Sequence, residues 1–158
     1  MLIPNNVRVA SEQGQAESVV FPVQVRVVGP DCGALPASDL RRLFRGRRLT
    51  AARRARLAQS GCVMALSGPR VVGVAAYERA DGELRVHEFG VDGSLASYLA
   101  DQVVGAVLDA LEMTCLAGGG RRLVLLPRAV IAGSQLRCRG FVTIAEGCAG
   151  SWFEKSFP

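Results

Sequence analysis

One apolar stripe constrains the fold of this chain more than any other feature. Leucine or valine recurs at every fourth position from Leu95 to Leu111, and Val104 and Leu108 widen the stripe. This spacing predicts a long helix with one buried face, which the three glycines 118–120 end. Apolar segments at 83–91 and 121–126 flank the helix, so we expect a strand–helix–strand crossover.

The rest of the chain alternates short apolar segments with turn signals such as Asp81-Gly82. We expect two helices before the crossover, one opening at 36–39 and one over 50–60, and a short helix at about 130–139 after it. Further strands are predicted at 19–29, 62–66, 71–77, 141–144 and 152–157. This order predicts an α+β fold with a mixed, mostly antiparallel central sheet of six to seven strands flanked by helices.

Length and composition favour one globular domain. The chain has 158 residues, of which 49% are hydrophobic and 21% charged, which excludes a disordered chain. Residues 1–18 are polar and aperiodic, so a flexible N-terminal tail is predicted there and a single domain over 19–158. No apolar run is long enough to span a membrane, and the N-terminus lacks a signal-peptide pattern. A cytoplasmic protein without a membrane partner is therefore expected.

Cysteine and histidine usage indicates reduced thiols and no metal site. The number of cysteines is odd, and no two have the spacing of a zinc or redox pair. His87 is the only histidine, so nitrogen ligands for a metal are scarce. The cysteines are Cys32, Cys62, Cys115, Cys138 and Cys148.

The order of elements resembles that of the GNAT superfamily of acyl-CoA-dependent N-acyltransferases. The sequence RVHEFGVD stands before the long helix and RRLVLLP stands after it. The chain then ends with a Gly-Phe pair, a loop and a strand with an aromatic residue and Glu-Lys, as such chains often do. Those residues are Gly140, Phe141, Trp152, Glu154 and Lys155.

The resemblance implies that acetyl-CoA or another acyl-CoA binds between the strands ending at Val91 and Leu126, with its pyrophosphate at the start of the long helix. The family's pyrophosphate motif falls on 96–101, where neither its basic residue nor its glycines are present. Leu99 is expected to obstruct the phosphate and Asp101 to repel it. The alternative is an ordinary helix N-terminus. The candidate cofactor-binding residues are Phe89, Gly90, Val91, Ser94, Ala96, Ser97, Tyr98, Leu99 and Ala100.

The catalytic candidates lie on the strand before the helix and near the Gly-Phe pair. His87 and Glu88 are candidate bases, and strict alternation would let only one of them face the cleft. Alternation groups His87 with Phe89, which favours His87. Where many members carry a tyrosine acid, this chain has Leu136, so Cys138 is the nearby substitute. The structural alternatives are a hydrogen-bonded histidine, an Arg-paired glutamate and a buried thiol.

An arginine cluster lies in the segment expected to border the acceptor cleft. Only one lysine, Lys155, contributes to the 19 basic residues and the net charge of +5. The cluster suits an acidic acceptor, the phosphates of CoA, or simply a solvated helix face. Only Phe44 is interleaved, which disfavours a nucleic-acid partner. The cluster consists of Arg41, Arg42, Arg45, Arg47, Arg48, Arg53, Arg54 and Arg56.

The resemblance implies a metal-free acyltransferase that moves an acetyl or small acyl group directly from acyl-CoA to an amine on a small molecule or peptide. The missing glycines and tyrosine support an alternative, a catalytically degenerate relative that binds a ligand or another protein. A homodimer is compatible with the last strand and with an exposed remainder of the long helix at Met113, Cys115 and Leu116.

Overall fold

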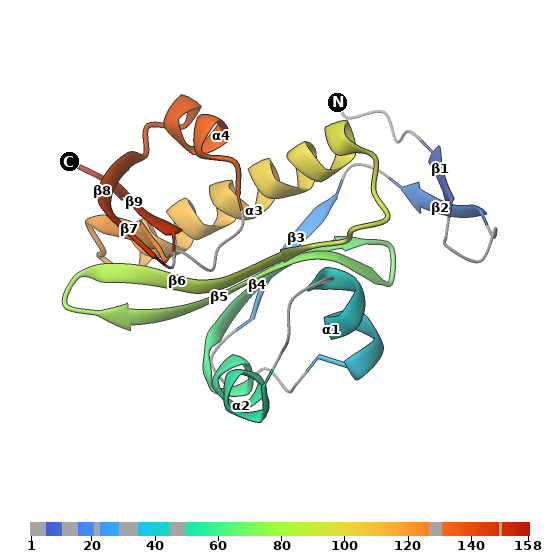
Figure 1. Cartoon of the computed structure of the whole chain (residues 1–158), viewed down its shortest axis with the longest axis horizontal. Coiled ribbons are helices and arrows are strands. Elements are labelled where there is room, and N and C mark those ends of the chain that lie inside the picture. The colour runs from blue at the N-terminus through green and yellow to red at the C-terminus, as the bar shows by residue number, and fades with distance from the viewer. Residues whose placement is uncertain are drawn as a thin grey trace.

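A computed structural model describes residues 6–10, 16–20, 23–28, 35–44, 50–126, 131–148 and 150–158. Seven strands form one mixed sheet in the order β3-β4-β5-β6-β7-β9-β8, with helices on both faces (Figure 1). Every described neighbouring pair in this sheet is antiparallel except β6 and β7. The predicted fold class, a mostly antiparallel sheet flanked by helices, is confirmed.

The predicted crossover is the centre of the fold. Strand β6 (Glu83–Val91) leads into helix α3 (Ser97–Ala117), which returns the chain to the parallel strand β7 (Arg122–Leu125). The apolar stripe of α3 is buried against the sheet, as its spacing predicted. This packing forms the larger of two cores.

The remaining strands and helices flank this crossover. Strands β3 (Gln24–Val28), β4 (Gly61–Ser67) and β5 (Arg70–Ala80) lie on one side of it in the sheet. Strands β8 (Val142–Gly147) and β9 (Gly150–Ser156) lie on the other.

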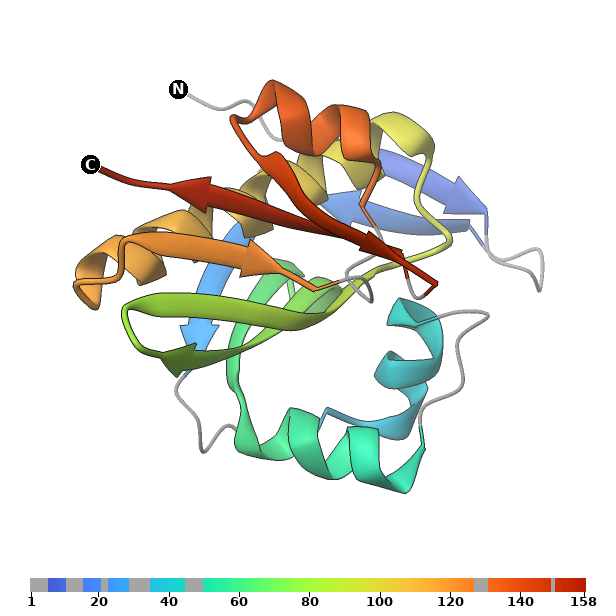
Figure 2. The same cartoon turned by 60° about the vertical axis from the view of Figure 1, so that its left-hand side comes forward.

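Helices α1 (Ala37–Leu43) and α2 (Ala51–Gln59) cover the opposite face of the sheet from α3 and α4 (Gly133–Cys138) (Figure 2). A second apolar cluster joins α1 and α2 to strands β4 and β5, so each face of this half of the sheet is buried. Beside it, the β9–β8 part has α3 and α4 on one face only (Figure 1).

The N-terminal segment contains two short strands. Strands β1 (Asn6–Ala10) and β2 (Ala16–Val20) pair with each other in a separate antiparallel sheet, and β2 extends past residue 18, where the predicted tail ends. The single strand predicted at 19–29 was wrong, because β2 ends at Val20 and β3 begins at Gln24. Pro22 between them lacks the amide hydrogen that an uninterrupted ladder needs. The domain boundary at residue 19 stays a prediction.

The close approach of α3 to the sheet depends on a glycine in β5. A Cβ atom at Gly73 would lie 2.6 Å from Val103 Cγ1, and Val103 is fully buried on α3. The valine has no room to retreat, because the core around it is close-packed. Gly73 thus allows the long helix to lie directly on the strand.

We predict that Gly73→Ala lowers the free energy of unfolding by about 1–3 kcal/mol through overpacking. Gly147→Ala is the matched control, because a Cβ atom there meets nothing within 4 Å. Urea unfolding of both variants measures the difference. Equal stability of the two would contradict the proposed packing.

Candidate functional site

The predicted cleft lies beside the parallel pair of β6 and β7. Pairing runs from Glu83 opposite Arg122 to Val86 opposite Leu125, and the Leu126 amide then donates to the Val86 carbonyl. Strand β6 continues to Val91. Among the described residues, the pairing of β7 with β6 thus extends to Leu126, and residues 127–130, which follow it, lie outside the described residues.

A β-bulge lies where this ladder ends. Across the β5–β6 pair, Ala76 is opposite Glu88. The next residue of β5, Tyr77, is opposite Val86, so that His87 is the extra residue of β6. A bulge interrupts the alternation of side chains between the two faces of a sheet.

The bulge overturns the expected alternation along β6. Val86 and Phe89 both belong to the core beneath α3, although strict alternation would place them on opposite faces. Both His87 and Glu88 instead contact α2 or the residue that ends it. The prediction that His87 shares a face with Phe89 was wrong. The prediction that His87 and Glu88 lie on opposite faces of the sheet was wrong as well. No pattern of residue types in this strand signals the bulge.

Glu88 is held in a buried ion pair with α2. Arg53 donates from Nε and Nη2 to the two carboxylate oxygens, each at 2.7 Å. This bidentate geometry is the strong form of an arginine–carboxylate contact. The hydrogen bond to Glu88 raises the pKa of Arg53 further above its ordinary value, so the arginine stays charged. Glu88 is thus an Arg-paired glutamate, which was the structural alternative to a base, and it anchors α2 to the sheet.

His87 is also buried, and its hydrogen bond indicates its tautomer. Its Nε2 lies 2.8 Å from Ser60 Oγ, while the same hydroxyl donates to the Arg56 carbonyl at 2.7 Å. A serine hydroxyl has one proton to donate, so Nε2 carries the hydrogen and donates to Ser60. In the neutral ring Nδ1 is then the basic nitrogen. Glu78 Oε1 lies 4.0 Å from Nε2.

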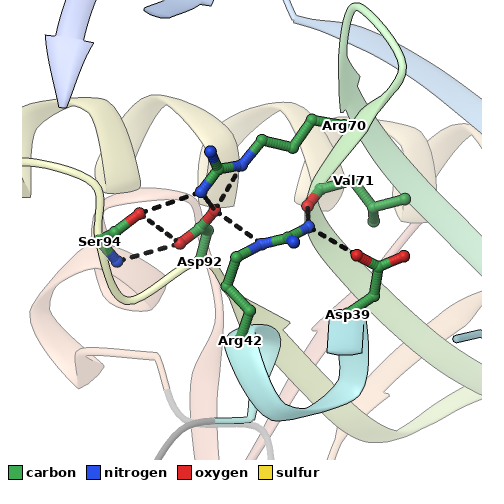
Figure 3. A network of polar contacts seen from close by, with 6 residues as sticks. All are labelled: Asp39, Arg42, Arg70, Val71, Asp92 and Ser94. Carbon is green, nitrogen blue, oxygen red and sulfur yellow. Dashed lines mark hydrogen bonds and ion pairs between the residues drawn. The ribbon is translucent and has the colours of Figure 1, made fainter. Parts of the chain in front are cut away.

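The loop between β6 and α3 is organised by a buried carboxylate (Figure 3). Asp92 accepts hydrogen bonds from the amide and hydroxyl of Ser94, at 3.0 and 2.7 Å. It also accepts from Arg70 of β5, with Nη2 at 2.6 Å from Oδ2. Arg42 of α1 adds an ion pair at 3.0 Å, although its N–H is not aligned for a hydrogen bond. Asp92 therefore connects α1, β5 and the loop before α3.

The environment of Asp92 favours its charged form. Burial disfavours a charged carboxylate, but hydrogen bonds from Ser94 and Arg70 outweigh it and hold the pKa of Asp92 below its ordinary value. Arg42 also contacts two other residues. Its Nη2 donates to the Val71 carbonyl at 2.7 Å and pairs with Asp39 at 2.9 Å. The hydroxyl of Ser94, a candidate cofactor ligand, is thus already engaged by Asp92.

The first turn of α3 leaves donors accessible. Its N-cap, Ala96, has no side chain that can cap the helix, and the amides of Leu99 and Ala100 bond to the Ala96 carbonyl. The preceding amides, of Ser97 and Tyr98, have no acceptor among the described residues, and both residues are exposed. Such amides at a helix start suit an anion.

Leu99 does not obstruct this helix start. Its side chain is only 2% exposed and packs in the core beneath α3, so the expectation that it would block an approaching phosphate was wrong. Helical spacing explains the difference, because Leu99 belongs to the buried stripe that also contains Leu95 and Val103. Asp101 is exposed, and Ala100 is half-buried.

The three candidates at the end of β6 have packing roles in this structure. Phe89 is buried beneath α3, and Val91 packs against the same core. A Cβ atom at Gly90 would lie 2.8 Å from the Leu43 carbonyl oxygen and 2.9 Å from the ring of Phe44. The glycine thus makes room for the end of α1. Their main chain, rather than their side chains, is what a ligand beside β6 would meet.

The structure does not bring Cys138 together with His87 and Glu88. Cys138 is exposed at the end of α4, which packs beside α3 on the opposite face of the sheet. Leu136, where the family's tyrosine stands, is fully buried in the core beneath α3. Neither side chain is therefore placed beside the two buried candidates on β6.

Several arginines of the cluster form ion pairs with carboxylates of the same chain. Arg42 and Arg53 are paired as described, and Arg56 binds Glu78 at 2.9 Å. The hydrogen bond from Arg56 lowers the pKa of Glu78. Arg41 and Arg54 are exposed, and positions 45, 47 and 48 of the cluster lie outside the described residues.

An apolar groove lies at the other end of α3, away from the predicted cleft. It has a volume of about 550 Å³ and is lined by Val27 of β3, Arg79 of β5 and Met113 of α3, among others. Met113 and Leu116 are exposed, as expected for the outer part of this helix. Cys115 is fully buried, so including it among the exposed residues was wrong.

Two further observations concern membrane-spanning helices and metal sites. In the described parts of the chain, no helix is both long and apolar enough to cross a bilayer. Within the same residues, no three histidine, cysteine or acidic side chains come together as metal ligands would.

Comparison with known proteins identifies the fold. No family model matches the sequence, and no curated protein matches it. Solved structures do match, including a polyamine N-acetyltransferase from Drosophila melanogaster, at 13% identity over 86% of this chain and 100% of that chain, with a TM-score of 0.63. Ard1 from Thermoplasma volcanium matches at 17% identity over 86% of this chain and 98% of that chain, with a TM-score of 0.60.

A third similar structure is N-acetylglutamate synthase from Neisseria gonorrhoeae, complexed with coenzyme A and N-acetyl-glutamate. It matches at 13% identity over 88% of this chain and 36% of that chain, with a TM-score of 0.59. At such identities the likeness shows the fold alone. The chain has the GNAT acyl-CoA N-acyltransferase fold, as the resemblance in its sequence implied.

The Asp92 network generates a prediction about acid stability. Because the folded-state pKa of Asp92 is depressed, its contribution is present above its unfolded pKa of about 3.9 and is lost as pH falls through the folded pKa. Asp92→Asn should lower the free energy of unfolding at pH 7 by about 2–4 kcal/mol, because Arg70 and Arg42 lose a buried partner. It should also lose less stability than the wild type on acidification below about pH 4.

Urea unfolding across this pH range tests the prediction. Asp109→Asn is the control, because Asp109 pairs with Arg139 but its side chain is 65% exposed. An exposed pair contributes at most about 1 kcal/mol. If the two variants had equal stability at pH 7, Asp92 would not have the structural role assigned to it.

Proposed function

We propose that this protein is an acyltransferase that moves an acetyl or small acyl group from acyl-CoA to an amine. The observation that carries the proposal is the start of α3 after β6, where the amides of Ser97 and Tyr98 are accessible and the described pairing of β6 with the parallel strand β7 reaches only Val86. The fold shared with solved acetyltransferases supports the same reaction class. The thioester is already activated, so the protein has to position the reactants.

The chain's main-chain groups hold acyl-CoA in this proposal. The amides of Ser97 and Tyr98 bind the pyrophosphate, helped by the positive end of the α3 dipole. The pantetheine lies along the end of β6, as a peptide adds to the edge of a sheet. Asp92 helps indirectly, because it fixes the loop through Ser94 and leaves the helix amides accessible.

We propose His87 as the base. The amine nitrogen attacks the thioester carbonyl carbon, the carbon–sulfur bond breaks, and the sulfur leaves as a thiolate, which takes up the proton that the nitrogen loses as it becomes an amide. Before attack the ammonium gives up a proton, which the imidazole ring of His87 accepts. The ring is buried, so the proton reaches it through a water or through a local opening of the cleft. Glu88 is the weaker candidate, because it would have to leave a bidentate pair with Arg53.

The helix-start amides are tested by removing one of them. Proline is tolerated at the first position of a helix, and Ser97 occupies that position in α3. Ser97→Pro should weaken acetyl-CoA binding about tenfold or more, because it removes one donor to a charged group. Ser97→Ala keeps the amide and is the control.

Acetyl-CoA binding is measured by calorimetry and by the rise in melting temperature. Wild-type protein should be stabilised by about 2.7 kcal/mol at 100 times the dissociation constant. Absence of any stabilisation by millimolar acetyl-CoA would favour the non-enzymatic alternative, a ligand-binding or protein-interaction module. That alternative is supported by the buried Leu136 at the position of the family's tyrosine.

The base is tested by the pH dependence of acyl transfer. His87→Ala should lower kcat about 100-fold near neutral pH. The loss should shrink as pH approaches the pKa of the acceptor amine, because the amine is then neutral without help. An unchanged kcat at pH 7 would make His87 a structural residue. Ser60→Ala, which removes the partner of Nε2 and the hydrogen bond to the Arg56 carbonyl, should shift the pH profile with a smaller loss.

A further inference from the structure

The last hairpin of the chain exposes three large apolar side chains. Val142 and Ile144 of β8 are 59% and 47% exposed, and Trp152 of β9 is 39% exposed. Isolated apolar residues on a surface are ordinary, but these three lie on one hairpin, with Trp152 paired to Ala145 beside the bulge at Ile144.

The contacts of β9 show which face Trp152 occupies. Lys155 reaches Glu112 of α3 at 2.9 Å, and Phe153 packs against the core beneath α3. Residues of a strand alternate between faces, so Trp152 and Glu154 lie on the opposite face. That is the face on which His87 and Glu88 contact α2, and α1 and α2 do not extend over β9 (Figure 1).

The strand register places Trp152 beside the end of the parallel ladder. Phe153 is opposite Leu125 of β7, so Trp152 lies next to Leu126. The Leu126 amide bonds to the Val86 carbonyl, one residue before His87. Adjacent strands are about 5 Å apart, so Trp152 lies roughly 10 Å across the sheet from His87.

Glu154 adds a negative charge to this face. Among the described residues, the more buried carboxylates have cationic partners, as Glu88 has Arg53 and Glu112 has Lys155. Glu154 is half-buried and accepts a hydrogen bond from Ser156 at 3.0 Å, but within the described residues it has no cationic partner. A carboxylate beside an exposed indole ring is complementary to an organic cation, through ion pairing and the negative face of the ring.

We propose that Trp152 and Glu154 form a subsite for a second cationic group on the acceptor. The acceptor is then a small diamine, or a similar amine, whose two cationic ends are joined by a short apolar spacer. One end reacts beside His87, and the other lies against Trp152 and Glu154. The inference rests on the proposed acyl transfer for the identity of the first end, whereas the cation subsite itself rests on the contacts of β9.

Trp152 also provides the measurement, because it is the only tryptophan in the chain. Its fluorescence is titrated with putrescine, which has two ammonium groups, and with n-butylamine, which has the same carbon chain and one. Putrescine should change the emission and bind at least about tenfold more tightly than n-butylamine, through its second charge. Equal affinity for the two amines would overturn the proposal.

Two variants of the same hairpin separate the subsite from general electrostatics. Glu154→Gln should bring the affinities for the two amines within about twofold of each other. Glu146→Gln removes an exposed carboxylate from β8 and should leave the preference for putrescine intact. Equal losses in the two variants would show only a general charge effect and would overturn the assignment to Glu154.

Three other outcomes are equally informative. If Trp152 emission changes with protein concentration and not with putrescine, the face is covered by a second copy of the chain, and the proposal fails. If acetyl-CoA raises the melting temperature but putrescine shows no preference, only the subsite is wrong. If putrescine binds through Glu154 but acetyl-CoA does not stabilise the protein, the subsite stands and acyl transfer does not.

Discussion

The crossover from β6 through α3 to the parallel strand β7 is the constraint on which the rest of this structure depends. Among the described residues, hydrogen bonding between the two strands reaches Val86 and Leu126, and β6 continues to Val91 before the chain enters α3. A parallel pair needs a crossover, and the buried stripe of α3 supplies one that packs firmly on the sheet. The candidate site is built around the end of β6.

Charge inside the molecule serves mainly to hold its parts together. Three carboxylates on or after β6 and β5, Glu88, Asp92 and Glu78, bind arginines from α1, α2 and β5. Asp92 occupies the loop where an anionic ligand is proposed to approach, yet it points its charge toward Arg42 and Arg70 (Figure 3). The arginine cluster that suggested capture of an acidic acceptor is therefore partly neutralised by carboxylates of the protein itself. Glu154 of β9, in contrast, has no cationic partner among the described residues.

The bulge at His87 explains why the site was harder to predict than the fold. Helical spacing identified α3 and its buried face, and turn residues located the hairpins, because these signals depend on neighbouring residues. The face taken by His87 depends on the register between β5 and β6, which slips by one residue between Ala76 and Tyr77. For Leu99 the local pattern was the better guide. Its place in the apolar stripe predicted burial, which the structure shows, whereas comparison with the family motif suggested that it would face a phosphate.

Local patterning was enough to establish an α+β chain with one long crossover helix, six of the seven sheet strands at nearly their observed positions, and a cluster of arginines on the helices before β4. The tertiary structure alone decided which charges pair, that Cys138 lies on the other face of the sheet from His87, and that Trp152 and Glu154 face the open side near the end of the β6–β7 ladder. The physical reason is the range of the interactions. Periodicity and turn chemistry act within a few residues, whereas register, bulges and ion pairs join positions far apart in the chain.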